Sequence, residues 1–200
     1  MQTRLDYLRH GLPVGGSRYR GHGIDDPLSE EGWAQMRKTT ERLDTRWDRI
    51  ITSPLARCAA FAQALGAERD IPVAIEPDLR EVGFGRWEGM TRRQLLEQSP
   101  EEYHAFYADP VNHRPAGAEP LGAFGRRVAK AFDQLVERHS GEHLLVVAHA
   151  GVIRATLGHV LQAPPAAWYR ATVDNAAVSR FVQDDKGAQL VWHNWRPAID

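Results

Sequence analysis

Two histidines and two arginines stand where the chain is expected to leave a buried strand. Arg9 and His10 follow one short apolar run, and His149 follows the most apolar run of the chain. Arg57 lies in the first turn of the helix expected after another short strand. Guanidinium groups match phosphate oxygens with forked hydrogen bonds, and a neutral imidazole can act as a nucleophile. Together these residue types predict transfer chemistry on a phosphoryl group, whereas arginines alone would predict only anion binding.

Each of these residues has a simpler explanation when it is taken alone. A single histidine at a strand end is more often a hydrogen-bonded structural residue, and a single arginine in the first turn of a helix usually faces solvent or pairs with a carboxylate. Their joint position favours the functional interpretation, because ligands of open α/β sheets bind beyond the carboxyl ends of the strands. Helix N-termini at that edge add unpaired backbone N–H groups that suit an anion.

The elements that must position these residues alternate between strands and helices. This alternation predicts an α/β fold with three layers (α/β/α), in which a mostly parallel central sheet has helices on both faces. We expect a single domain over residues 1–200, with a small helical insertion at 85–120 over the carboxyl edge and its active site. The expected strands are 5–8, 49–52, 71–75, 144–148, 177–182 and 190–195, and the expected longer helices are 29–43, 54–66, 121–139 and 152–161.

Capping residues predict where the helices begin and end. Ser29 is expected to cap one helix, and Ser53 followed by Pro54 has the pattern of an N-cap with proline at the first helical position. Gly66 is expected to end that second helix. Pro72 lacks a backbone donor and therefore favours an edge position or an irregular start for the strand that contains it.

The charge balance argues against a large surface for nucleic acid or an acidic membrane. The formal net charge is −1, so any positive site must be local. Arg92–Arg93 and Arg126–Arg127 are isolated pairs, and we expect them to be charges on helix surfaces. The expected partner is a small molecule, with no nucleic acid and no membrane, while a monomer and a homodimer both remain open.

Cysteine and histidine usage gives no indication of a metal or another cofactor. Cys58 is the only cysteine, which excludes an intrachain disulfide and a cysteine-based zinc site and leaves its own role open. His139 and His143 have the interval of a metal-binding pair, but Ser140–Gly141 indicates a helix end between them, so we expect both at the surface. No apolar run has the length of a signal peptide or a membrane span, and a cytoplasmic location is expected.

Four blocks of sequence resemble the histidine phosphatase superfamily, which includes phosphoglycerate mutases and many phosphatases. The blocks occur in the family's order and cover about residues 4–182. The resemblance implies a metal-independent phosphomonoesterase that works through a phosphohistidine and needs no cofactor. The blocks are Leu8-Arg9-His10-Gly11, Ser53-Pro54-Leu55-Ala56-Arg57, Leu79-Arg80-Glu81 with Gly85-Arg86-Trp87-Glu88-Gly89, and Val147-Ala148-His149-Ala150-Gly151.

The resemblance also implies a role for each residue of the constellation. His10 would attack phosphorus, and Arg9, Arg57 and His149 would hold the phosphoryl oxygens. Glu81 would protonate the leaving group and then take a proton from the attacking water. The physical chemistry agrees, because nearby guanidinium groups disfavour a protonated imidazole and so keep the nucleophile neutral.

Two other acidic residues compete for the acid–base role, and one further arginine could contact the substrate. Glu88 and Asp78 are the rivals of Glu81, but the family block favours Glu81, and a structural hydrogen bond in its own turn is the favoured interpretation of Glu88. Arg18 resembles a substrate-binding arginine of the family, although its loop would equally accommodate a solvated charge.

Departures from the family pattern favour hydrolysis over mutase activity. Many relatives continue Arg-His-Gly with Glu-Thr, and mutases carry an asparagine a few residues later, whereas residues 12–16 here are Leu-Pro-Val-Gly-Gly. Mutases of the family also look longer between the residues matching Glu81 and His149, and they carry a longer C-terminal tail. A phosphoglycerate mutase is therefore the less favoured interpretation.

Within the family, the chain resembles the α-ribazole-5′-phosphate phosphatases of cobalamin biosynthesis. The resemblance lies in the glycine-rich stretch after Arg-His-Gly, in residues 53–58 and in residues 115–119, although Ala118 and Pro120 depart from the usual Pro-Gly-Gly-Glu-Ser. The main rival is a broad-specificity sugar or nucleotide phosphatase. A non-catalytic phosphate-binding module is a further alternative, but its signature would be the loss of His10 or Glu81, and both are present.

Overall fold

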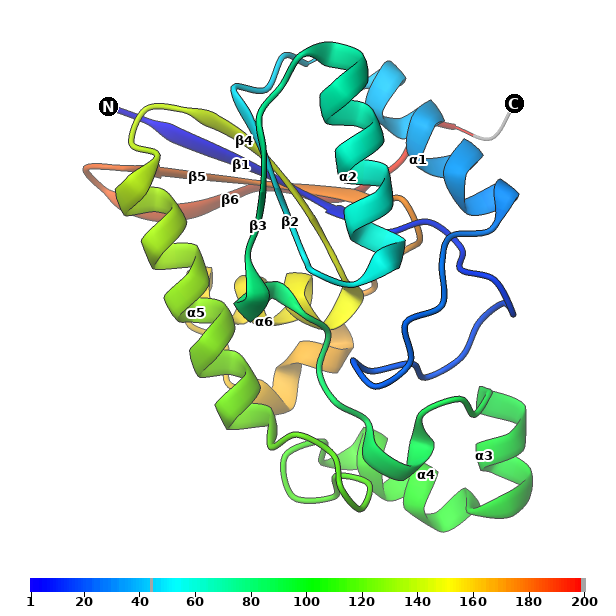
Figure 1. Ribbon diagram of the computed structural model, residues 1–200. Helices are drawn as coiled ribbons and strands as arrows, with labels where there is room; N and C mark the ends of the chain where they lie inside the picture. The colour runs from blue at the N-terminus through cyan, green and yellow to red at the C-terminus, as the bar shows by residue number, and fades with distance from the viewer. Residues whose placement is uncertain (44, 199–200) are drawn as a thin grey trace.

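The core of the fold is a mixed sheet. The structure, a computed structural model, describes residues 1–43 and 45–198. Its strands are β1 (Thr3–Arg9), β2 (Arg49–Thr52), β3 (Val73–Ile75), β4 (His143–Ala148), β5 (Val178–Asp184) and β6 (Gly187–Trp195). In the described residues the strand order is β3-β2-β4-β1-β5-β6 (Figure 1). The neighbours β3, β2, β4 and β1 pair in parallel, whereas β5 pairs antiparallel with β1 and β6 pairs antiparallel with β5. This pairing confirms the predicted α/β fold with a mostly parallel sheet.

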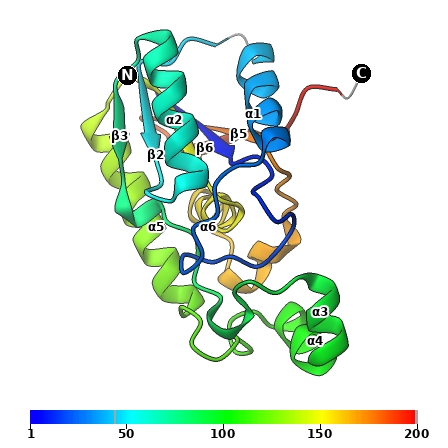
Figure 2. The ribbon, with the colours of Figure 1, turned by 45° about the vertical axis from the view of Figure 1, so that its right-hand side comes forward.

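Helices cover both faces of the sheet, as expected. α1 and α2 pack on one face, α5 and α6 pack on the other, and α3 and α4 lie beyond one end of the sheet (Figures 1 and 2). No helix in the described ranges is long and apolar enough to cross a membrane. The helices are α1 (Glu30–Arg42), α2 (Ala56–Arg69), α3 (Arg92–Gln98), α4 (Pro100–Ala108), α5 (Leu121–Arg138) and α6 (Ala150–Val160), with short 3-10 helices η1 (Pro77–Leu79), η2 (Gly85–Trp87) and η3 (Pro165–Arg170).

The central strand β4 explains why its sequence is continuously apolar. Leu144 and Val146 are buried in the cluster that contains α5 and α6, whereas Leu145 and Val147 are buried in the cluster that contains α1 and α2. Side chains alternate between the faces of a strand, so a strand covered on both sides must be apolar at every position. This double burial anchors the strand end from which His149 emerges.

The start of α2 differs from the prediction. Ser53 and Pro54 do not form an N-cap and first helical residue, because the helix begins at Ala56 and is preceded by Leu55, which makes no side-chain capping bond. The hydroxyl of Ser53 instead lies 2.7 Å from Nε2 of His149. The same hydroxyl accepts a hydrogen bond from the backbone N–H of Leu55 (3.3 Å), so a long-range contact to His149 is added to a local turn that lies before the helix.

The end of α2 also differs from the prediction. The helix continues through Gly66 to Arg69, and Asp70 takes the left-handed conformation that ends it. Gly66 is required inside the helix by packing, because a Cβ there would lie 2.3 Å from Cγ2 of Val73. Its glycine reflects close contact between helix and strand rather than a helix end.

Two other local predictions are confirmed. The hydroxyl of Ser29 accepts a hydrogen bond from the backbone N–H of Gly32, as an N-cap should. The strand that follows Pro72 is the edge strand β3, as expected for a proline-containing segment.

The expectation that His143 is a surface residue is wrong. Its side chain is only 13% exposed, and Nε2 lies 2.9 Å from Oδ2 of the fully buried Asp6. The Asp6 carboxylate also accepts hydrogen bonds from Nε1 of Trp47 (2.9 Å) and from Nε (2.7 Å) and Nη2 (3.0 Å) of Arg180. Four donors thus surround this carboxylate, toward the amino end of β4.

Candidate active site

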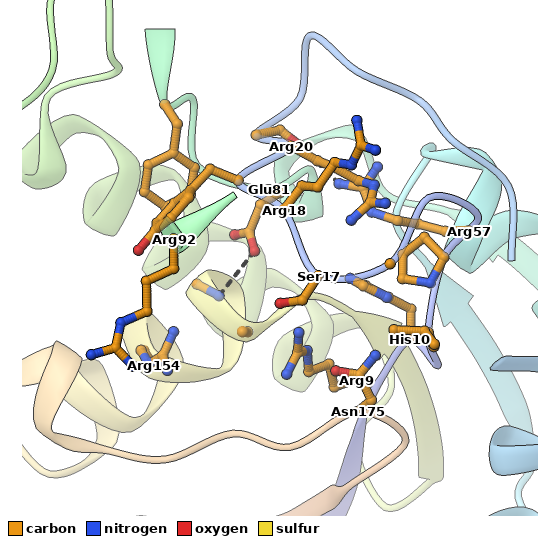
Figure 3. A pocket seen from close by; sticks show the side chains of 18 of the residues that line it. Arg9, His10, Ser17, Arg18, Arg20, Arg57, Glu81, Arg92, Arg154 and Asn175 are labelled. Carbon is orange, nitrogen blue, oxygen red and sulfur yellow. Dashed lines mark hydrogen bonds between the residues drawn. The ribbon is translucent and has the colours of Figure 1, made fainter. Parts of the chain in front are cut away.

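A cavity of about 420 Å³ lies where β1, β4 and the N-termini of α2 and α6 come together. Five of the six candidate site residues line it, and Figure 3 shows them pointing into the same space from different elements. The expected positive charge is therefore concentrated in one place. These five residues are Arg9, His10, Arg18, Arg57 and Glu81.

His10 is held with one ring nitrogen committed to the backbone. It is the first residue after β1, and its own N–H donates to the carbonyl of Ala148 on β4. Its Nδ1 lies 2.7 Å from the carbonyl oxygen of Gly11. A carbonyl can only accept, so Nδ1 carries the proton of the neutral ring and Nε2 keeps a free lone pair.

The surroundings of His10 keep the ring neutral. Burial, followed by the positive charges of Arg9 and Arg57, holds the pKa of His10 well below its ordinary value. A neutral imidazole with a free Nε2 is the form that can attack an electrophile.

Arg57 is clamped by backbone carbonyls of the loop that follows His10. Its Nη1 donates to the carbonyl of Ile24 (3.0 Å) and its Nη2 to the carbonyl of Gly21 (2.8 Å). The residue is 1% exposed, and its Nε is buried and has no hydrogen-bond partner among the described residues. The carboxylate paired with it is the half-exposed Asp25, at 3.9 Å.

Arg9 repeats this arrangement on the other side of His10. Its Nη1 donates to the carbonyl of Val173 (2.6 Å), while its Nε is buried without a hydrogen-bond partner in the described part of the chain. Burial, followed by the charge of Arg154, lowers the pKa of Arg9 to about 10. An unpaired buried N–H is unfavourable by about 1–3 kcal/mol, so two such groups beside one cavity indicate a site for an anion.

Glu81 faces the cavity from the segment after η1. Its Oε1 accepts from the N–H of Val82 (2.9 Å), and its Oε2 accepts from the N–H of Gly151 (3.2 Å), in the first turn of α6. A Cβ at position 151 would lie 2.2 Å from Oε1, so only glycine lets the carboxylate approach the helix this closely. The geometry places one carboxylate at a site otherwise dominated by cations.

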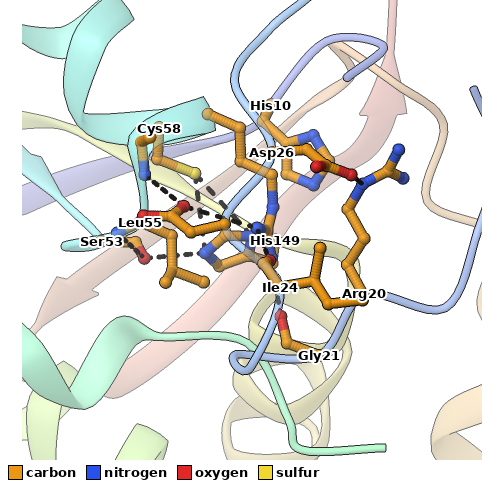
Figure 4. A network of polar contacts seen from close by, with 12 residues as sticks. His10, Arg20, Gly21, Ile24, Asp26, Ser53, Leu55, Cys58 and His149 are labelled. Atoms are coloured by element: carbon orange, nitrogen blue, oxygen red, sulfur yellow. Dashed lines mark hydrogen bonds and ion pairs between the residues drawn. The ribbon is translucent and has the colours of Figure 1, made fainter. Parts of the chain in front are cut away.

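His149 lies behind His10 and does not line the cavity. The two rings are 5.2 Å apart, centre to centre, in an edge-to-face arrangement. Nε2 of His149 is hydrogen-bonded to Ser53, and Sγ of Cys58 lies 3.6 and 3.8 Å from the two ring nitrogens (Figure 4). Burial, followed by the charge of Arg57, lowers the pKa of His149 well below its ordinary value.

Comparison with known families identifies the family of this chain. Residues 7–196 match the model of the histidine phosphatase superfamily (branch 1). The chain belongs to the histidine phosphatase superfamily.

Several relatives of this histidine phosphatase carry phosphatase names. It is 33% identical to the adenosylcobalamin/alpha-ribazole phosphatase of Salmonella typhimurium over 203 residues, which cover 97% of this chain and 99% of the relative. The crystal structure of the alpha-ribazole phosphatase from Shigella flexneri superposes with a TM-score of 0.83 at 28% identity, covering 98% and 99% of the two chains. The mycobacterial glucosyl-3-phosphoglycerate phosphatase superposes with a TM-score of 0.84 at 27% identity, covering 97% and 99%. These comparisons support phosphatase activity for the chain.

The rival acidic residues of this histidine phosphatase lie outside the cavity lining. The carboxylate of Glu88 accepts from the N–H of Gly23 (3.1 Å) and of Phe84 (2.9 Å), which is a structural arrangement. Asp78 contributes its backbone carbonyl to a hydrogen bond from Arg127. Neither residue lines the cavity, whereas Glu81 does.

Arg18 lies at the exposed rim, where its Nε donates to the carbonyl of Gly15 (2.9 Å) and its side chain lines the cavity (Figure 3). This position is compatible with contact to the distal part of a substrate. It is also compatible with a solvated charge, so the substrate-binding role stays a prediction.

Sequence reasoning missed several cavity residues. Arg92 lies over the ring of Tyr103 and Arg154 lies over the ring of Tyr169, so each cation is attached to an aromatic wall of the cavity. The signal for Arg154 was its position one turn after the N-terminus of α6, on the face that carries Ala150. Arg92 was expected to be a charge on a helix surface; it is exposed at the start of α3 but also lines the cavity, which depends on how the 85–120 segment folds back over the sheet edge.

Proposed function

We propose that this histidine phosphatase hydrolyses phosphomonoesters through a phosphohistidine on His10. The observation that carries the proposal is the pair of buried Nε groups of Arg9 and Arg57, which have no hydrogen-bond partner among the described residues, beside a neutral His10. A phosphoryl group supplies the acceptors that both N–H groups lack, and its phosphorus would then lie next to the free Nε2 of His10. Arginine in this arrangement binds the transferring group and offsets its developing charge.

The first chemical step forms the phosphohistidine. Nε2 of His10 attacks phosphorus in line, an N–P bond forms, and the bond between phosphorus and the ester oxygen breaks. Protonated Glu81 gives its proton to the departing alkoxide, which leaves as a neutral alcohol. The backbone donors Val82 and Gly151 hold the carboxyl group in place during this transfer.

The second step regenerates the enzyme. The Glu81 carboxylate takes a proton from a water molecule, whose oxygen attacks phosphorus while the N–P bond breaks. Inorganic phosphate leaves, His10 is neutral again, and Glu81 has recovered its proton. Arg9 and Arg57 stabilise the charge of both transition states, and loss of one such preorganised donor typically lowers kcat by about 10²–10³-fold.

We further propose that His149 supports the ring of His10 from the side away from the cavity, with its own ring fixed by Ser53. A role of His149 in holding phosphoryl oxygens stays a prediction.

Three predictions about the whole chain also stay predictions: metal independence, a single domain over residues 1–200 and a cytoplasmic location. Addition of a chelator should leave the rate unchanged. Inhibition by a chelator would point to a metal in the mechanism.

The first candidate substrate is α-ribazole 5′-phosphate, because relatives along the full chain are named for it. A broad specificity for sugar or nucleotide phosphates is the alternative, and the similarity to a glucosyl-3-phosphoglycerate phosphatase favours a cavity that accepts other small esters. A phosphoglycerate mutase is less favoured.

A phosphate-release screen of the purified protein tests these proposals. The panel contains α-ribazole 5′-phosphate, sugar phosphates, nucleoside monophosphates and phosphoglycerates, each ranked by kcat/KM. A clear preference for α-ribazole 5′-phosphate would support the first candidate, and similar values across the panel would support broad specificity. Interconversion of phosphoglycerates faster than their hydrolysis would indicate a mutase. If phosphate is released from none of the esters, the result would contradict the proposed phosphatase activity and favour a phosphate-binding module.

A further inference from the structure

Arg127 is not the helix-surface charge that its sequence context predicted. It projects from α5 onto the segment that carries Glu81, and its side chain is only 11% exposed. Nη1 donates to the carbonyls of Asp78 (2.6 Å) and Arg80 (2.8 Å), and Nη2 donates to the carbonyl of Glu81 (3.1 Å). One guanidinium therefore holds three backbone carbonyls within a span of four residues.

A carboxylate holds that guanidinium in a single orientation. Glu119 accepts from Nε of Arg127 at Oε1 (2.8 Å) and from Nη2 at Oε2 (2.9 Å). Burial alone would raise the pKa of Glu119, but the hydrogen bonds and charge of Arg127 outweigh it and lower that pKa below its usual value. A two-point pair of this kind fixes the plane of the guanidinium, which a single contact would not.

Glu119 also connects the end of the 85–120 segment to Gly83, two residues before the segment begins. Its backbone N–H donates to the carbonyl of Gly83 (3.0 Å), and its Oε2 accepts from the N–H of Gly83 (3.2 Å). Glu119, at the end of the 85–120 segment, is thereby connected through Arg127 to the backbone of Glu81. The 85–120 segment lines one side of the cavity. Neither Arg127 nor Glu119 lines the cavity itself.

The chain between β3 and η2 needs such support. After the three residues of η1, residues 80–84 belong to no strand or helix, so their carbonyls find no partner in a regular ladder. Figure 1 shows this segment passing alongside α5. A hydrogen bond to a charged group is stronger than one between neutral groups, and Arg127 makes several at once, which fixes the backbone from which the Glu81 side chain extends.

We propose that Arg127, oriented by Glu119, is a positioning residue for the acid–base work of Glu81. The proposal rests on the proposed function, because it assumes that Glu81 is the proton donor. Catalytic geometry is strict, and a misplacement of about 1 Å can lower a rate about 100-fold. Arg127 would thus affect the reaction without touching the substrate.

The experiment compares Arg127→Gln with Arg126→Gln. Arg126 is the adjacent residue on the same helix and is exposed, so its variant controls for loss of charge on α5. The substrates are 4-nitrophenyl phosphate and phenyl phosphate, two similar esters of which the second has the poorer leaving group and depends more on the acid. The quantity measured is kcat/KM, which covers binding and transfer to His10 and excludes the later hydrolysis.

Arg127→Gln should lower kcat/KM for phenyl phosphate about 10- to 100-fold and for 4-nitrophenyl phosphate less than about threefold. Arg126→Gln should change both values by less than twofold, roughly as expected for an exposed charge. An equal fall for both esters in Arg127→Gln would overturn the proposal, because it would indicate a general loss of folded or binding-competent enzyme.

A double-variant cycle with Glu81→Gln shows whether the effect passes through Glu81. Once the acid is removed, adding Arg127→Gln should lower kcat/KM for phenyl phosphate by less than about twofold. A further tenfold loss in that background would mean that Arg127 acts by another route. If Glu81→Gln lowers kcat/KM equally for both esters, the result would instead contradict the proposed role of Glu81 as proton donor.

A second variant keeps the test decisive if Arg127→Gln does not fold, as judged by thermal unfolding. Arg127→Lys retains the charge beside Glu119 but cannot span three carbonyls with a planar fork. It should show the same selective loss for phenyl phosphate, to a smaller degree. If Arg127→Lys keeps the wild-type kcat/KM for both esters, the proposed role of the planar guanidinium group would be overturned.

Discussion

Two clusters of cationic and imidazole side chains lie at opposite parts of β1 and β4, and they differ in electrostatic balance. Toward the amino end of β4, the Asp6 carboxylate lies among donors from His143, Trp47 and Arg180. Burial raises the pKa of Asp6, but the hydrogen bonds from His143 and Arg180 outweigh it, so the net shift is downward. The negative charge of Asp6 is therefore balanced by hydrogen-bond donors of the protein itself.

At the carboxyl ends of β1 and β4, the positive charges are not balanced in the same way. Arg9 and Arg57 keep buried N–H groups without partners in the described residues, and the carboxylate paired with Arg57 is half-exposed and 3.9 Å away. His10 and His149 are buried and kept neutral beside these cations. Similar residue types therefore stabilise the fold at one end and create a demand for an anion at the other. The difference is that Asp6 is hydrogen-bonded directly to its cationic neighbours, whereas the carboxylate of Glu81 accepts from backbone N–H groups.

Replacement of the nucleophile should give the largest effect, on the cluster around His10. His10→Ala should lower phosphate release by at least about 10³-fold while the thermal unfolding temperature stays the same or rises, because a buried functional group is removed. Phosphate-release kinetics and calorimetry check the two parts. Substantial residual turnover would refute the nucleophile assignment.

Replacement of the central carboxylate should affect the cluster around Asp6 in the opposite way. Asp6→Asn should lower the free energy of unfolding by about 3–5 kcal/mol, because it leaves buried charged partners uncompensated, while kcat/KM of the folded enzyme changes less than twofold. Urea unfolding measures the first quantity. Asp185→Asn, at an exposed turn position, is the control. A large loss of activity without loss of stability would contradict the comparison.

An added anion should distinguish the two clusters directly. Inorganic phosphate should stabilise the wild-type protein by about 2.7 kcal/mol at a concentration of 100 Kd, and Arg57→Gln should abolish most of this gain. Asp6→Asn should retain it, since its partners lie away from the cavity. Thermal shifts measured against phosphate concentration test this, and an equal gain in all three proteins would argue against a specific anion site.

The pH dependence of stability should show the smallest effect. Because the pKa values of His10 and His149 are lowered by burial, the unfolded chain binds more protons than the folded one below about pH 6.5, and stability falls as the pH falls. Each histidine contributes at most about 1.4 kcal/mol per pH unit. Urea unfolding at pH 7, 6 and 5 should give a shallower slope for His10→Ala. An unchanged slope would mean that folding does not lower the pKa of His10.

Local signals predicted much of the fold and the centre of the site. Apolar runs located β1 and β4, and the residues that follow them, His10 and His149, lie at the carboxyl edge as expected. Ser29 caps its helix because the capping bond spans only three residues. These features depend on neighbours in the chain, so composition and spacing are enough to find them.

Other features could not be predicted because their partners are distant in sequence. Ser53 has the local pattern of a cap, but its hydroxyl bonds to His149, 96 positions away. Arg126 and Arg127 are identical neighbours, and only the second meets the carbonyls near Glu81, more than 40 positions away.

The sequence by itself determined which residues could perform phosphoryl chemistry and at which strand ends they stand, because both depend on residue type and local periodicity. Only the tertiary structure decided which cations keep unpaired N–H groups at the cavity, which arginine supports Glu81, and which carboxylate balances His143. The physical reason is that burial and pairing depend on where the second partner lies, and in each of these cases it comes from a different element of the fold.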